Sequence, residues 1–159
     1  MVVVADTSPI NYLIQISCIH ILPALYQKVI VPRAVIDELG HRNAPEAVAS
    51  WASQPPSWIS VSDLQTPVDD NELRKLDSGE IAAISLAVRE YPAVLLLMDD
   101  AKARSVAKRL GVATVGTLGI LRDAAGLRLI SLHDAVTRLR ATSFRAPQEL
   151  LNQLAQQAE

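Results

Sequence analysis

Acidic residues that follow apolar runs are the residues of this sequence best suited to chemistry. Asp6 ends the run Val2–Ala5, and the pair Asp99 and Asp100 ends the run Val94–Met98. If these runs are neighbouring parallel strands, the three acids meet at one edge of a sheet, where open α/β sheets place their ligands. Each acid could instead cap the helix that follows it, a role that suits Asp100 well.

Two further acids lie in segments with helical spacing. Glu38 shares a helix face with Ala34 and Val35, so we expect its side chain to point inward. Glu80 lies over an apolar stripe of its own helix, but it also fits a capping box of the D-x-x-E kind with Asp77. The spacing of Glu80 is therefore compatible with a structural role and with a chemical one.

Carboxylates that gather in one place need a cation. Like charges within ~5 Å of one another repel, and a buried charge without a partner costs several kcal/mol. Acidic oxygen ligands favour Mg²⁺ or Mn²⁺ over zinc. Zinc is further disfavoured because Cys18 is the only cysteine and the histidines, His20, His41 and His133, lack ligand spacing.

If Asp6, Glu38, Glu80 and the Asp99/Asp100 pair converge, a divalent cation shared among them would make their charges tolerable.

The basic residues are segregated from the acidic ones. Residues 1–100 carry 6 Lys+Arg against 13 Asp+Glu, and residues 101–145 carry 9 against 2. Such a division suits an anionic polymer as substrate, although a solvated helix face explains it equally well. The candidate phosphate-binding cations are Arg33, Lys102, Arg104, Lys108 and Arg109.

Short apolar runs alternate with longer segments of helical spacing, which predicts the α/β class with a parallel sheet covered by helices. The Ser8–Pro9 pair and Pro32 predict helix starts, and a final helix is expected over about 147–157. The predicted strands are Val2–Ala5, Val29–Val31, Trp58–Val61, Val94–Met98 and Val112–Val115.

Length and composition indicate a single domain over residues 1–159. The amino terminus lacks a basic region ahead of an apolar segment, and no apolar run approaches the ~18 residues that a membrane span requires. We therefore expect a cytoplasmic protein without a membrane partner. Aromatic residues make up 4% of the chain, which argues against a stacking platform for single strands.

Four acidic motifs, taken in order, resemble the signature of the PIN-domain family. They are D-T-S-P at Asp6–Pro9, V-I-D-E-L at Val35–Leu39, L-D-S-G-E at Leu76–Glu80 and L-L-M-D-D at Leu96–Asp100. The combination of L-D-S-G-E-I-A-A-I, D-D-A-K-A-R-S-V-A and V-G-T-L-G-I-L resembles the toxin ribonucleases of VapC-type toxin–antitoxin pairs. The similarity covers about residues 1–130, which leaves 131–159 as a helical appendage.

This resemblance implies a three-layer α/β/α fold around a five-stranded parallel sheet. It also implies Mg²⁺ or Mn²⁺, endonucleolytic cleavage of RNA, a homodimer and an antitoxin partner. On this resemblance, one or two divalent ions held by Asp6, Glu80 and the Asp99/Asp100 pair, with Glu38 at the rim, would activate a water for in-line attack on a phosphodiester. This scheme requires no nucleophilic side chain. Asp6 matches the first acid of the family, Glu38 the second and Glu80 the third, while either Asp99 or Asp100 matches the fourth.

One position departs from the family pattern and another has two readings. Met98 stands where many members carry Thr or Ser, two residues before Asp100. Ser8 matches a small hydroxyl near the metal, and we include it among the substrate contacts, although it could also cap the helix that follows.

Two other functions are compatible with parts of the sequence. A PIN-like module that binds RNA without cleaving it would keep the same fold. The presence of Met98 where many family members carry Thr or Ser is compatible with this alternative. A phosphatase or phospho-acceptor domain is disfavoured, because Asp6–Ser8 lacks the paired acids expected after the first strand.

Overall fold

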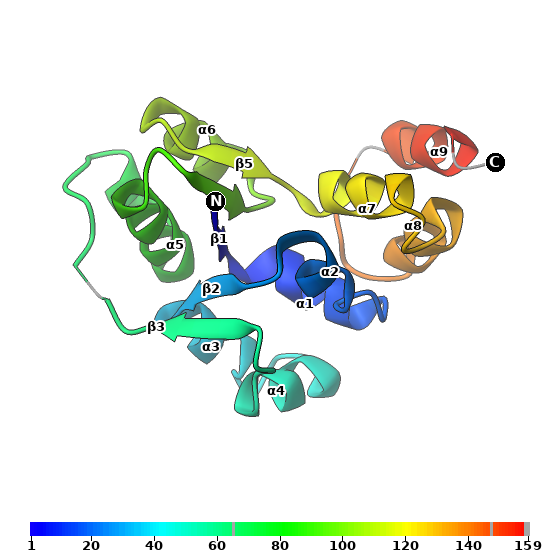
Figure 1. Ribbon diagram of the computed structural model, residues 1–159, viewed down its shortest axis with the longest axis horizontal. Helices are drawn as coiled ribbons and strands as arrows, with labels where there is room; N and C mark the ends of the chain where they lie inside the picture. The colour runs from blue at the N-terminus through cyan, green and yellow to red at the C-terminus, as the bar shows by residue number, and fades with distance from the viewer. Residues whose placement is uncertain (65, 147, 158–159) are drawn as a thin grey trace.

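The computed structural model describes residues 1–64, 66–146 and 148–157, and places a twisted parallel sheet between layers of helices (Figure 1). The sheet has five strands in the order β3-β2-β1-β4-β5, and all neighbouring pairs are parallel. The strands are β1 Val2–Ala5, β2 Val29–Pro32, β3 Ile59–Ser62, β4 Val94–Leu97 and β5 Ala113–Val115. The predicted α/β/α architecture is therefore confirmed.

The central strand β1 lies at the point where the strand order reverses. It pairs with β4 from Val2 opposite Val94 to Ala5 opposite Leu97, and with β2 through Val4 opposite Ile30. The crevice outside the carboxyl ends of the strands at such a switch point is the usual ligand site of open α/β sheets.

Two hydrophobic clusters flank the sheet. One joins apolar residues of α1, α3, α7 and α8, and the other joins those of α5 and α6. Each helix thus buries one apolar face, which is the arrangement that a parallel sheet covered on both sides requires. The helices are α1 Thr7–Gln15, α2 Ile21–Tyr26, α3 Arg33–Leu39, α4 Glu46–Ser53, α5 Ser78–Arg89, α6 Ala101–Arg109, α7 Thr117–Gly126, α8 Leu132–Arg140 and α9 Gln148–Gln157.

The first helix begins earlier than the Ser8–Pro9 pair predicts. Asp6, with extended backbone angles of φ −85° and ψ 174°, occupies the cap position, and Ser8 lies within the first turn. Asp6 is the single residue between the end of β1 at Ala5 and the start of α1 at Thr7. The cap position carries no side-chain hydrogen bond, which leaves the Asp6 carboxylate available for other contacts.

The last two helices pack on the same apolar cluster as α1. Val136, Leu139, Leu151 and Leu154 are buried in that cluster, and α8 and α9 run beside each other (Figure 1). The predicted final helix is observed from Gln148; position 147 lies outside the described residues. None of the helices described is both long enough and apolar enough to cross a membrane.

Candidate functional site

Five carboxylates surround one cavity of about 300 Å³ at the carboxyl edge of the sheet. They come from the end of β1, from α3, from the start of α5 and from the end of β4. Four of them are acids that the sequence singled out, and Asp77 is the fifth. The cavity is lined by Asp6, Thr7, Ser8, Asn11, Glu38, Asp77, Glu80 and Asp100.

Asp6 is the most deeply placed of these acids, with only 5% of its surface exposed. The pKa of Asp6 is raised from 3.8 to about 7, and burial is the largest cause of the increase. The Thr7 backbone hydrogen bond opposes the increase, while the negative charges of Glu80, Asp77 and Glu38 contribute to it. A carboxylate with this pKa is about half protonated at neutral pH. A cation in the cavity would favour its charged form.

Glu80 belongs to a capping box and to the cavity at the same time. The Asp77 carboxylate accepts a hydrogen bond from the Glu80 backbone N–H at 2.8 Å, and the Glu80 carboxylate accepts one from the Asp77 N–H at 3.2 Å. The pKa of Glu80 is raised to about 7, mainly by burial and also by the charges of Asp77 and Asp100, while the backbone hydrogen bond from Asp77 opposes the increase. The predicted capping box is thus observed, and it fixes two acids at the rim of one cavity.

Glu38 is fixed by a contact from the first helix. The Thr7 hydroxyl donates a hydrogen bond to Glu38 Oε2 at 2.9 Å. Partial burial raises the pKa of Glu38, while this hydrogen bond lowers it. The contact joins α1 to α3, although the two residues are 31 positions apart in sequence.

Gly79 allows helix α5 to approach these acids closely. A Cβ atom at this position would lie 2.7 Å from Glu38 Oε2 and 3.5 Å from Asp6 Oδ1. Separations below about 3.0 Å do not occur for real Cβ atoms, so a side chain here would displace a carboxylate. The absence of a side chain at Gly79 is therefore a condition of the cluster.

The acids of the Asp99/Asp100 pair lie in different surroundings. Asp100 caps α6 by accepting a hydrogen bond from the Ala103 N–H at 2.8 Å, and it lines the acidic cavity. Asp99 accepts two hydrogen bonds of 2.7 Å, from the Thr117 N–H and the Thr117 hydroxyl, and it lines two neighbouring cavities instead. Burial raises the pKa of Asp99, and these hydrogen bonds lower it.

The donor set of the cavity consists of oxygen atoms only, which is the ligand chemistry of Mg²⁺ and Mn²⁺. Over the described ranges, no three acids, histidines or cysteines stand close enough to form a ready ion cage. Glu80 and Asp100 each accept a hydrogen bond from a backbone N–H near the start of a helix. The residue types therefore fit such a cation, because each of these two carboxylates keeps a second oxygen that could bind the ion while the first accepts the backbone hydrogen bond.

The predicted phosphate-binding cations separate into engaged and available residues. Arg33 forms an ion pair with Asp63 at 2.9 Å. Arg104 donates a hydrogen bond from Nε to Thr114 Oγ1 at 3.2 Å, and its charge lowers the pKa of Asp99. Lys102 and Lys108 are exposed on α6.

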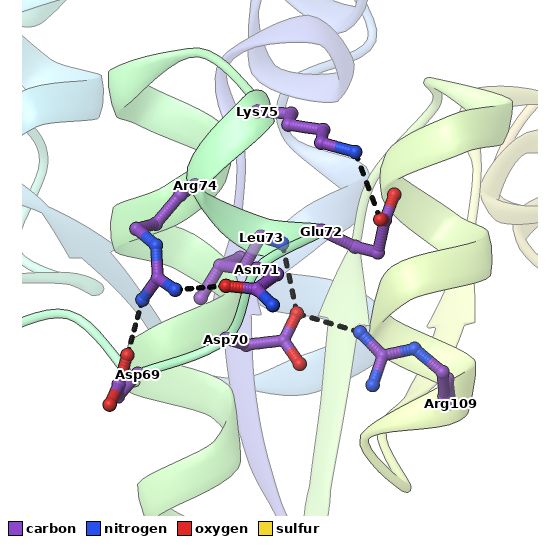
Figure 2. Close-up of polar contacts among 8 residues, drawn as sticks. All are labelled: Asp69, Asp70, Asn71, Glu72, Leu73, Arg74, Lys75 and Arg109. Carbon is purple, nitrogen blue, oxygen red and sulfur yellow. Dashed lines mark hydrogen bonds and ion pairs between the residues drawn. The ribbon is translucent and has the colours of Figure 1, made fainter.

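Arg109 anchors the segment that leads into α5 (Figure 2). Its guanidinium pairs with Asp70 at 2.7 Å, and Asp70 also accepts a hydrogen bond from the Leu73 N–H at 2.9 Å. Both contacts hold the pKa of Asp70 below its usual value. Arg109 thus ties α6 to the residues just before Asp77.

Sequence reasoning missed Thr7 and Asn11 as members of the site, and it treated Asp77 only as a cap. A signal existed for Asn11, because it lies three residues after Ser8 and so shares a helix face with it. No local pattern indicated the Thr7 contact, which depends on how α1 and α3 pack.

Comparison with known proteins gives one match. A sequence model of the PIN-domain family matches residues 2–159, nearly the whole chain. No curated protein and no solved structure matches the chain.

Proposed function

The chain belongs to the PIN-domain family, and we propose that it is a divalent-metal-dependent endoribonuclease that cleaves phosphodiester bonds of single-stranded RNA. PIN domains are typically nucleases, which are hydrolases of phosphodiester bonds. The observation that carries the proposal is the gathering of five carboxylates around one cavity of about 300 Å³. Such an assembly is costly without a cation, and it is suited to a reaction in which a cation is needed.

Asp6, Glu80 and Asp100 are the residues that would hold Mg²⁺ or Mn²⁺, with Glu38 at the rim. Asp99 remains the alternative fourth acid, because it is the direct neighbour of Asp100 in the chain. When bound, such an ion supplies positive charge to the phosphate oxygens and lowers the pKa of a bound water.

The other residues of the site position these acids and the substrate. Thr7 orients the Glu38 carboxylate, and Asp77 fixes the start of α5. Lys102 and Arg104, exposed on α6, are placed to contact phosphates beside the scissile bond. Ser8 lines the cavity and can donate a hydrogen bond to a phosphate oxygen.

One observation favours a second candidate, an RNA-binding module without cleavage activity. One carboxylate oxygen of Glu80 and one of Asp100 accept a backbone hydrogen bond in the structure, so both side chains have a structural role that does not depend on an ion. The two candidates differ in whether added Mg²⁺ or Mn²⁺ leads to cleavage of the RNA.

A cleavage assay distinguishes the candidates. Purified protein is incubated with end-labelled single-stranded RNA of varied sequence in Mg²⁺, in Mn²⁺ or in EDTA, next to Asp6→Asn and the matched exposed-site control Asp134→Asn. We expect cleavage with either ion by wild type and Asp134→Asn only. Metal-independent RNA binding without any cleavage by wild type would favour the second candidate.

The resemblance to VapC-type toxins supports a more specific proposal. In it the protein is a cytoplasmic homodimer and the toxin of a type II pair, held inactive by an antitoxin protein. Expression in a bacterial host should then arrest growth for wild type and leave growth normal for Asp6→Asn. Normal growth at equal levels of folded, RNA-cleaving wild-type protein would contradict the toxin role.

A further inference from the structure

A second cavity adjoins the acidic one and is larger, at about 580 Å³. The two cavities share Ser8 and Asp100 as lining residues. The volume lies within the range of ~300–1,000 Å³ that is usual for sites of small organic ligands. Its remaining lining residues are Tyr12, Asp99, Ala101, Ser143, Phe144 and Arg145.

The turn between α8 and α9 forms one wall of this second cavity. Phe144 meets Tyr12 of α1 edge to face, with ring centroids 5.1 Å apart and an interplanar angle of 83°. The Tyr12 hydroxyl and Ser143 Oγ lie 3.0 Å apart, and the Phe144 N–H donates to Thr142 Oγ1 at 3.2 Å. These contacts hold two aromatic rings and two hydroxyl groups beside the acidic site.

A third cavity, of about 340 Å³, continues from the second and brings in positive charge. Both are lined by Asp99, Phe144 and Arg145, and the third adds Arg104. Arg104 and Arg145 are exposed, and over the described residues no ion pair involves either of them. Among the described residues that line the third cavity, the carboxylate is that of Asp99, which is already engaged by Thr117.

We propose that these two adjoining cavities bind the nucleotide next to the scissile phosphate, with its base against Phe144 and Tyr12 and its phosphate between Arg104 and Arg145. The proposal rests on the proposed ribonuclease function and adds a specificity site to it. Aromatic rings bind bases through their π faces, and arginines bind phosphate in bidentate fashion. Continuity with the acidic cavity is what places this nucleotide beside the reacting bond.

The hydroxyl groups give the subsite a means of discriminating bases. Tyr12 and Ser143 already hydrogen-bond to each other, and each retains capacity for a further contact. A base whose edge completes these hydrogen bonds is favoured over one that leaves a polar atom unpaired. The protein is therefore expected to cut RNA with a base preference at one position flanking the cleaved bond.

Nucleotide binding can be measured without catalysis. Uridine and adenosine monophosphates are titrated into the full chain in EDTA, and backbone amide shifts are followed by NMR. We expect shifts at Ser8 and over 142–146 for at least one nucleotide, with affinity reduced about tenfold or more by Phe144→Leu and by Arg145→Gln. Arg122→Gln, on an exposed part of α7 that lines none of these cavities, is the matched control and should bind as wild type does.

Two variants are used so that the test remains interpretable if one of them folds poorly. Phe144 packs on the main apolar cluster, so Phe144→Leu could loosen the turn, whereas Arg145 is exposed and Arg145→Gln leaves packing intact. If neither nucleotide shifts the 142–146 amides of wild type, or if both variants bind as tightly as wild type, the subsite proposal is wrong.

Cleavage of an RNA library randomised around the cut site separates this proposal from the proposed function. We expect wild type to show a preference at one flanking position, and both variants to cut with that preference reduced about tenfold or more. Cleavage with unchanged preference in both variants would overturn the subsite and leave the ribonuclease standing. No cleavage by wild type, with nucleotide-induced shifts at 142–146, would overturn the ribonuclease while keeping the binding site.

Discussion

Replacement of Asp6 by asparagine should stabilise the protein in the absence of metal, by an amount that depends on pH. Burial raises the pKa of Asp6 from 3.8 to about 7, so the folded state binds the proton more tightly than the unfolded chain does. Between these two values, rising pH therefore removes stability from wild type. Asparagine has nearly the same shape and cannot ionise.

The size of the effect follows from the shift in pKa. Each pKa unit corresponds to about 1.4 kcal/mol, so above pH 7 the folded wild type carries a penalty of about 4 kcal/mol from Asp6. At pH 5 the penalty is about 2 kcal/mol, because the folded side chain is then protonated and only the unfolded one is ionised. The free-energy advantage of Asp6→Asn should therefore grow by about 2 kcal/mol between pH 5 and pH 8.

Urea unfolding in EDTA, followed by the fluorescence of Trp51 and Trp58, measures this difference. Both tryptophans are half-buried and lie side by side, with ring centroids 6.1 Å apart, so their emission reports unfolding. Asp134→Asn, an exposed substitution, is the control and should change little at either pH. An Asp6→Asn advantage that is the same at pH 5 and pH 8 would refute the assignment of a buried, strained carboxylate.

Three further outcomes are expected. Gly79→Ala should change the free energy of unfolding by less than about 1 kcal/mol, since Ala favours helix. It should nevertheless lower kcat/KM by at least about tenfold, because the added Cβ displaces the Glu38 carboxylate. Steady-state kinetics that show equal activity would contradict this. Asp100→Asn keeps a side-chain oxygen that can cap α6, so its free energy of unfolding should lie within about 0.5 kcal/mol of the wild-type value, whereas Asp100→Ala should lose about 1 kcal/mol. Both variants should fail to cleave RNA. A fully active Asp100→Asn would exclude the carboxylate from the reaction. The stabilisation conferred by Mg²⁺, measured as the increase in Tm, should weaken from pH 8 to pH 5.5. The pKa of both Asp6 and Glu80 is about 7, so protons compete with the ion at the lower pH. A thermal-unfolding series with an unchanged Mg²⁺ effect would argue against ligation by these two acids.

The fold could be predicted from the sequence because the apolar runs are short and well separated. All five strands form at the predicted runs, with ends displaced by a residue or two, as at Ile59–Ser62 and Ala113–Val115. Parallel pairing then places strand ends at one edge, which is why Asp6 and Asp100 could be predicted to lie close together. The positions of the strands depend on local sequence pattern, and the proximity of the two acids follows from a general rule of sheet topology.

The remaining parts of the site depend on packing that local pattern does not encode. Arg33 pairs with Asp63 across 30 residues instead of with Asp37 one turn away, because β3 places Asp63 beside it. Phe144 reaches Tyr12 only because α8 folds back onto α1. The sequence could not decide which of the adjacent acids Asp99 and Asp100 faces the acidic cavity, because the choice depends on the hydrogen bonds that the distant Thr117 donates to Asp99.

The most direct test of the metal site is a crystal structure of the protein grown with Mn²⁺ and recorded at a wavelength where manganese scatters anomalously. We expect an anomalous peak in the cavity of about 300 Å³ between Asp6, Glu80 and Asp100, within bonding distance of their carboxylate oxygens. The absence of a peak there at millimolar Mn²⁺ would contradict the assignment of these acids as metal ligands.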